Sequence, residues 1–170
     1  MGKKIFETQR LIIREAEVED APFFYELLNS RGWLDNIGDR NIHSLEDAEL
    51  FIVDKYLISY SANGFGFWVV CSKEDNKAIG MAGFAKRPHL EYADLGYAFL
   101  PDFQQKGFAR EAAEAALKYG KEDLKFEKII AIVLANNGPS VNLLKKLGFV
   151  YDKAIVHDTG DELDQYVHHF

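Results

Sequence analysis

Apolar and polar positions alternate between strand-like and helix-like spacing along the chain, which predicts an α/β (α+β) protein. The short β-branched run 10–14 predicts a first strand. Residues 21–28 follow with apolar positions at helical spacing, and Ser44 predicts the N-terminus of a second helix that extends towards residue 60. The polar, glycine-punctuated segment 30–43 between them fits either a loop or a short helix.

The second half of the chain begins with two apolar runs, 66–71 and 78–84, which flank a polar turn and predict an antiparallel hairpin. Another strand is predicted at 92–100, followed by a turn and a helix that ends near Gly120. The run 128–134 is the most β-branched of the chain and predicts a central, buried strand.

The last quarter predicts one short helix and a closing hairpin. Apolar residues at 141–146 predict the helix, which Gly148 ends. The hairpin is built from 149–156 and 165–170 around an acidic turn that includes Asp158. Because no repeat, low-complexity tract or linker interrupts the chain, we expect one domain over residues 1–170.

Composition excludes several classes of partner. The formal net charge of −7 argues against nucleic acid, which is bound by a basic surface. No apolar stretch is long enough for a leader or a membrane span, so we expect a cytoplasmic protein with no membrane partner. Cys71 is the only cysteine, and neither the acidic turn nor the C-terminal histidines have ligand spacing, so no metal is expected.

The stretch 92–120 carries the first chemical hypothesis. A turn between a strand and a helix brings backbone N–H groups together at the helix N-terminus, where they bind phosphate-like anions. Gly107 lets the backbone of this turn approach an anion without a Cβ in the way. The stretch therefore predicts a pyrophosphate site.

Four segments resemble the GCN5-related N-acetyltransferases. Residues 104–109 (QQKGFA) match the family's Q/R-x-x-G-x-G/A turn, and Asn137 with Ser140, followed by 144–149 (LKKLGF), resembles its N-x-x-S and K-L-G-F segment. Residues 10–14 and 37–52 are similar to the branch that contains the ribosomal-protein alanine N-acetyltransferases.

The resemblance implies both a fold and a reaction. The fold would be a central mixed, mostly antiparallel sheet of about seven strands, flanked by about four helices, with splayed central strands that form a cofactor cleft. The reaction would be direct transfer of an acetyl group from acetyl-CoA to a primary amine, without a metal. The acceptor would be a protein N-terminus or a small molecule. A catalytically silent acyl-CoA-binding module or sensor is the alternative, and a homodimer stays open.

The cofactor contacts follow from the same resemblance. Backbone groups at the end of the predicted strand 92–100 would pair with the pantetheine arm as an added strand would. The turn that follows this strand would hold the pyrophosphate. Asn137 of the N-x-x-S motif has two possible roles, a contact with coenzyme A and a helix cap. The expected cofactor-binding residues are Phe99, Leu100, Gln105, Lys106, Gly107, Phe108, Ala109, Arg110 and Asn137.

Proton transfer needs a donor for the leaving thiolate and a base for the amine. The family often places a tyrosine where this chain has Leu144, so Ser140 becomes the candidate acid, with a helix cap as its other role. Asp94 interrupts an apolar strand and is the candidate base, because an unpaired buried carboxylate would be costly. Glu91, at the start of that strand, is either a second base or a surface charge.

Acceptor selection is expected from the N-terminal half of the chain. Trp33 and Leu34 are candidate walls of the acceptor pocket, although Trp33 fits a core position equally well. An α-amine has a pKa near 8 and needs little deprotonation, whereas a lysine costs about 4 to 5 kcal/mol to deprotonate at neutral pH. The absence of an obvious strong base therefore favours an α-amine or another weakly basic acceptor.

Overall fold

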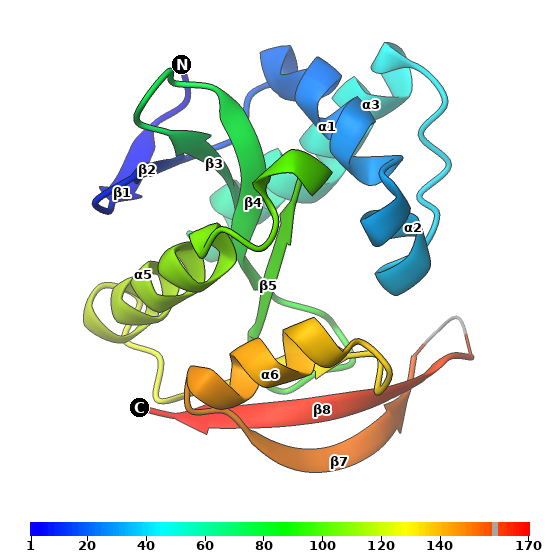
Figure 1. Ribbon diagram of the computed structural model, residues 1–170, viewed down its shortest axis with the longest axis vertical. Helices are drawn as coiled ribbons and strands as arrows, with labels where there is room; N and C mark the ends of the chain where they lie inside the picture. The colour runs from blue at the N-terminus through cyan, green and yellow to red at the C-terminus, as the bar shows by residue number, and fades with distance from the viewer. Residues whose placement is uncertain (158–159) are drawn as a thin grey trace.

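A mostly antiparallel sheet forms the centre of the computed structural model, which describes residues 1–157 and 160–170 (Figure 1). Within this described part the sheet has eight strands, and Asp158 of the expected acidic turn lies outside it. The strands in spatial order are β1 (Lys4–Glu7), β2 (Leu11–Arg14), β3 (Phe67–Ser72), β4 (Ala78–Ala85), β5 (Asp94–Phe99), β6 (Lys128–Val133), β8 (Glu162–His169) and β7 (Val150–Val156).

Helices cover both faces of this sheet. One face carries the N-terminal helices with a π-helical turn (Ile52–Leu57) between α3 and α4, and the other face carries α5 and α6. None of the helices in the described part is both long and apolar enough to cross a bilayer. The helices are α1 (Ala21–Leu28), α2 (Arg31–Asn36), α3 (Leu45–Phe51), α4 (Ile58–Asn63), α5 (Phe108–Glu122) and α6 (Gly138–Lys146), and 3₁₀ turns occur at Val18–Asp20 and Pro101–Phe103.

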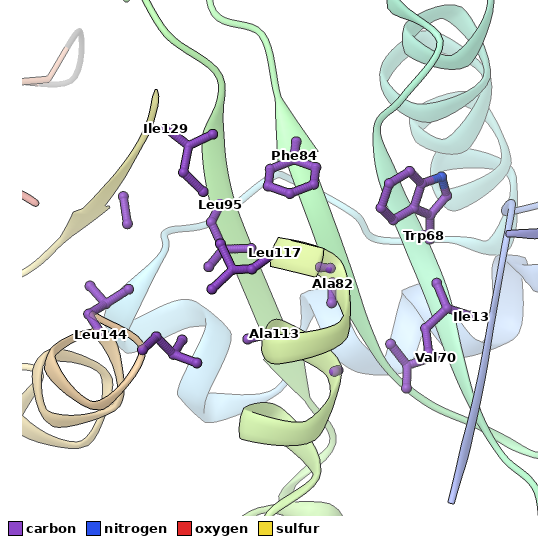
Figure 2. Close-up of a cluster of buried hydrophobic side chains, with 14 of the residues drawn as sticks. Ile13, Trp68, Val70, Ala82, Phe84, Leu95, Ala113, Leu117, Ile129 and Leu144 are labelled. Atoms are coloured by element: carbon purple, nitrogen blue, oxygen red, sulfur yellow. The ribbon is translucent and has the colours of Figure 1, made fainter. Parts of the chain in front are cut away.

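The small side chains of α5 let this helix lie close to the sheet. Figure 2 shows Ala113 and Leu117 directed at Leu95 of β5 and towards Ala82 and Phe84 of β4. All of these side chains are buried, which removes their apolar surface from water. The close packing of this small-residue face on the sheet fixes the position of the turn before α5.

β5 and β6 are adjacent parallel strands that separate almost at once. Their register contains one pair, Asp94 with Ile130, and the Ile130 N–H donates to the Ala93 carbonyl at 3.0 Å. Beyond this point β6 turns away with β8 and β7, which cross the lower part of Figure 1 at a steep angle to β4 and β5. The mixed sheet with splayed central strands that the resemblance implied is therefore confirmed.

Three local features differ from the sequence expectations or decide between them. β1 was not expected, because four residues at a sheet edge carry little pattern. The segment after Ser30 forms a short helix, α2, followed by a loop. α6 begins at Gly138 and Asn137 caps it, so the capping role expected for Ser140 is wrong and the one expected for Asn137 is confirmed.

The tight packing of α5 on the sheet predicts how the helix responds to added volume. Ala116→Leu should lower the free energy of unfolding by about 1 to 3 kcal/mol, because the buried site has no room for three more carbons. Urea denaturation measures this change, with the half-buried Ala115→Leu as the control. Equal stabilities of the two variants would mean that the close approach of α5 is not a packing constraint.

Candidate active site

The open edge of β5 forms the centre of the candidate site. Neighbouring residues of an antiparallel ladder direct their N–H and C=O groups to opposite sides. Leu100 N–H donates to Ile79 O beside β4, so the backbone groups of Tyr97 and Phe99 point to the other side, where β6 has diverged. An extended ligand can therefore pair with this edge as an additional strand would.

Two expected contacts of this edge change in detail. Leu100 N–H is bonded to Ile79 O and its carbonyl accepts from Phe103 N–H at 2.9 Å, so only its carbonyl could still accept from a cofactor arm, and the expected pairing stays a prediction. The Phe99 carbonyl accepts from the Gln104 side-chain amide at 3.0 Å, which leaves the Phe99 N–H as the group that faces the opening.

The turn before α5 has the geometry of an anion site. Gly107 has a φ of +81° and directly precedes the first residue of the helix, and Gln105 is also left-handed at +59°. The first turn of a helix has N–H groups without intrahelical acceptors, and here these belong to the residues around Phe108. A Cβ at Gly107 would lie 3.3 Å from Arg10 Nη2, so a larger residue would be both strained and crowded.

Arg10, which the sequence reading did not assign to the site, holds this turn in place. Its guanidinium donates to the Lys106 carbonyl at 3.0 Å, pairs with Glu111 at 2.7 Å and stacks on the Phe108 ring at 4.2 Å. Burial alone would raise the pKa of Glu111, but hydrogen bonds from Thr8 and Arg10 outweigh it and lower that pKa. The turn between β1 and β2 therefore fixes the start of α5.

The other cofactor candidates of this turn lie around its rim. Lys106 is exposed, with its ammonium 5.8 Å from the Phe103 ring, and Ala109 is half-buried against the core. Arg110 pairs with Glu114 at 2.8 Å on the solvent side of α5, as the helical spacing predicts. The side chains of Lys106 and Arg110 thus stand at the outer side of the turn.

Asp94 is the buried carboxylate of the site. Its residue is 4% exposed, its Oδ2 accepts from Arg87 Nε at 3.3 Å, and its Oδ1 is buried with no hydrogen-bond partner in the described residues. Burial raises the pKa of this carboxyl, and the Arg87 charge opposes that rise without cancelling it. A carboxylate oxygen without a partner can accept a proton or hydrogen bond from a ligand.

A second arginine, Arg40, lies close enough to Arg87 for their charges to interact. Arg40 lies in the loop after α2 and is half-buried. Burial and the nearby charge of Arg87 lower the pKa of Arg40. One guanidinium group therefore contacts the carboxylate and a second lies near the first, in contrast to the net negative charge of the whole chain.

Ser140 lies in the first turn of α6 and faces β5. Its N–H donates to the cap Asn137 Oδ1 at 3.4 Å, and its hydroxyl is 3.0 Å from the Tyr97 hydroxyl. Burial raises the pKa of Tyr97. The sequence reading missed Tyr97, because it appears there as one more aromatic residue of a strand.

The remaining candidates lie apart from this cluster. Glu91 is exposed and lines a surface hollow of about 490 Å³ with Phe65 and Lys125, so the structure does not bring it to Asp94. Trp33 is 6% exposed and belongs to the core beneath the N-terminal helices, whereas Leu34 is 40% exposed on α2. Their proposed roles stay predictions. No group of three or more potential metal ligands occurs among residues 1–157 and 160–170.

This fold and cleft coincide with a match to a family model. Residues 10–150 match the model of the acetyltransferase (GNAT) domain, which is most of the chain. The chain therefore belongs to the GNAT family, as its motifs indicated, and it is an N-acetyltransferase.

Among relatives, the chain is 35% identical over 141 residues to the uncharacterized N-acetyltransferase YnaD of Bacillus subtilis, covering 83% of this chain and 79% of that protein. It is 26% identical to the spermidine N(1)-acetyltransferase of Escherichia coli, covering 86% and 76%.

Solved structures show the same fold. A GNAT acetyltransferase from Bacillus anthracis superposes with a TM-score of 0.78 at 26% identity, over 96% of each chain. RimL, a ribosomal L7/L12 α-N-protein acetyltransferase solved with coenzyme A, gives a TM-score of 0.83 at 16% identity, over 98% of each chain. This second likeness concerns the fold alone.

The raised pKa of Asp94 predicts a pH-dependent effect of Asp94→Asn on stability. A native pKa above the unfolded value contributes stability at low pH, and this contribution is lost as the pH rises through the native pKa. Relative to the wild type, Asp94→Asn should therefore gain stability between about pH 4 and neutrality. Urea midpoints at several pH values measure it. A difference that does not change with pH would contradict the burial of a charged Asp94.

Proposed function

We propose that this chain transfers the acetyl group of acetyl-CoA directly to a primary amine, with residues 1–170 acting as one domain. The observation that carries the proposal is the continuous path from the turn at Gly107, along the open edge of β5, to Asp94. Side chains of β5 alternate between the two faces of the sheet. The buried carboxylate therefore lies on the face opposite to Ser140.

The residues present fit coenzyme A on structural grounds. Backbone N–H groups from Gln105 to Arg110 would hold the pyrophosphate, since the left-handed Gly107 leaves no Cβ to obstruct it. The Phe99 and Tyr97 backbone groups would pair with the pantetheine arm. When bound, acetyl-CoA supplies a thioester, whose carbonyl carbon accepts the amine and whose sulfur leaves.

The side chains of the cleft would move the protons of this reaction. Asp94 takes a proton from the acceptor nitrogen, directly or through water, as the new C–N bond forms. Its raised pKa makes it a better base than an ordinary aspartate. Ser140 donates to the sulfur as the C–S bond breaks, and water replaces the proton that Ser140 gives. Glu91 would take part in these proton transfers only with an acceptor bound at the other face of the sheet.

The charges around Asp94 support an α-amine as the acceptor. Arg87 pairs with the carboxylate and Arg40 interacts with Arg87, and these two positive charges would repel a polyamine such as spermidine. An α-amine has a pKa near 8 and needs only about 1 kcal/mol for deprotonation at neutral pH. A peptide N-terminus or a small amine with one positive charge satisfies both conditions, and the exposed Leu34 would contact its next residue.

Acceptor preference tests this function directly. Thiol release from acetyl-CoA should be about tenfold or more faster with short peptides bearing a free N-terminus than with spermidine or N-blocked lysine peptides. Faster turnover of spermidine would refute the α-amine preference and leave acetyl transfer intact. Binding of coenzyme A without turnover of any amine would instead make the protein a silent acyl-CoA-binding module.

The pyrophosphate site has its own test. Gly107→Asp should weaken coenzyme A binding at least about tenfold, because it adds a Cβ, backbone strain and a negative charge to the anion site. Gly64→Asp is the matched control, since Gly64 has a φ of +76° with open space around its Cβ position and ends α4 away from the cleft. Isothermal titration with coenzyme A reads both. Unchanged affinity in Gly107→Asp would place the pyrophosphate elsewhere.

A further inference from the structure

The side chain of Tyr97 has no role in the proposed reaction as described above, in which only its backbone contacts the cofactor. It lies three residues after Asp94 on β5, and its side chain faces α6 rather than Asp94. Its hydroxyl is 3.0 Å from the Ser140 hydroxyl, so the contact joins β5 to α6 beyond the point where β5 and β6 separate. The two hydroxyl groups thus meet beside the open edge of β5.

The Tyr97 hydroxyl has two acceptors of Ser140 within reach, and in the contact with Ser140 Oγ either hydroxyl can be the donor. The Tyr97 oxygen lies 3.0 Å from Ser140 Oγ and 3.5 Å from the Ser140 carbonyl, and the shorter distance is the better hydrogen bond. Burial raises the pKa of Tyr97, which therefore stays a neutral phenol and keeps its proton. With the phenol donating to Ser140 Oγ, the proton of the serine is free to point elsewhere.

We infer that Tyr97 is a positioning residue that directs the Ser140 hydroxyl proton into the cleft, towards the sulfur of the acyl donor. A serine hydroxyl rotates freely when it has no fixed partner. A hydrogen bond accepted from Tyr97 fixes that rotation and polarises the serine O–H, which makes the serine a stronger donor.

The inference rests on the proposed acetyl transfer and specifies how the leaving group is stabilised. As the C–S bond breaks, its electron pair stays on sulfur, while the acetyl carbon forms its bond to the acceptor nitrogen. Ser140 donates its hydrogen bond and then its proton to sulfur, and water returns that proton. Tyr97 holds its own proton throughout, so the phenol is neither consumed nor ionised.

Tyr97→Phe removes the hydroxyl and keeps the ring. We expect kcat with an N-terminal peptide to fall about tenfold, while the Kd of coenzyme A and the KM of acetyl-CoA change less than about twofold. Tyr119→Phe removes a hydroxyl of the same kind from α5, away from Ser140, and should leave kcat unchanged. A kcat of Tyr97→Phe equal to that of the wild type would overturn the inference.

A double-mutant cycle separates positioning from direct action. If Tyr97 acts through Ser140, adding Tyr97→Phe to Ser140→Ala should cause no further loss of kcat. Independent, additive losses would mean that Tyr97 contacts the reacting atoms itself, and the positioning role would be wrong. A loss of thermal stability that accounts for the whole fall in activity would also overturn it.

A second replacement covers the case in which Tyr97→Phe does not fold. Fluorotyrosine at position 97 keeps the ring and the hydroxyl, and it changes only the acidity of the phenol. We expect kcat to shift in the wild-type background and to stay constant when Ser140 is alanine. Unchanged kcat in both backgrounds would contradict the inference. Absence of turnover by the wild type with every amine would overturn the proposed function and this inference together. If the wild type turns over, unchanged kcat in the variants would overturn the inference alone.

Discussion

The separation of β5 from β6 is the constraint on which the rest of this structure depends. One residue pair, Asp94 with Ile130, joins the two strands, and beyond it the β5 edge has no neighbouring strand. An unpaired edge inside a sheet is costly unless something else accepts its hydrogen bonds. α5 and α6 on one face and the N-terminal helices on the other hold the two halves of the sheet apart, so the opening is a product of packing.

This opening also divides the proposed chemistry between two faces. The alternation of side chains along β5 places Asp94 and Arg87 on the face of the N-terminal helices, and Tyr97 with Ser140 on the face of α5 and α6. A base and a proton donor on opposite faces do not hydrogen-bond to each other, so each is available for its own step. Each can then keep the protonation state that its own step requires, the carboxylate charged and the hydroxyls neutral.

The sequence could predict those parts of the site that depend on local spacing. The strand, the Gly107 turn and the small-residue helix are continuous in the chain, so pattern and glycine placement were sufficient to predict this strand–turn–helix unit. Asp94 could be identified as a candidate because burying a carboxylate in an apolar strand is costly unless it has a partner or a function. Of the two candidates for the cap of α6, Ser140 was wrong. Pro139 fits inside the first turn of the helix, so the cap lies before it, at Asn137.

What the sequence could not predict are contacts between distant segments. Arg10 and Glu111 are 101 residues apart, and Tyr97 and Ser140 are 43 apart, so no local pattern connects them. The bonding of Leu100 to Ile79 likewise depends on the register of β4 and β5, which apolar alternation does not fix to the residue.

The Arg10 contact ties the turn before α5, the proposed pyrophosphate site, to the first two strands at the far edge of the sheet. Glu111 stands in the first turn of α5, where its charge would oppose a phosphate, and Arg10 neutralises it while bonding Lys106 O. Ligand affinity at the turn is therefore coupled to the stability of the β1–β2 edge, and this coupling acts in both directions. A ligand held at the turn would tighten the N-terminal edge, and fraying of that edge would loosen the ligand.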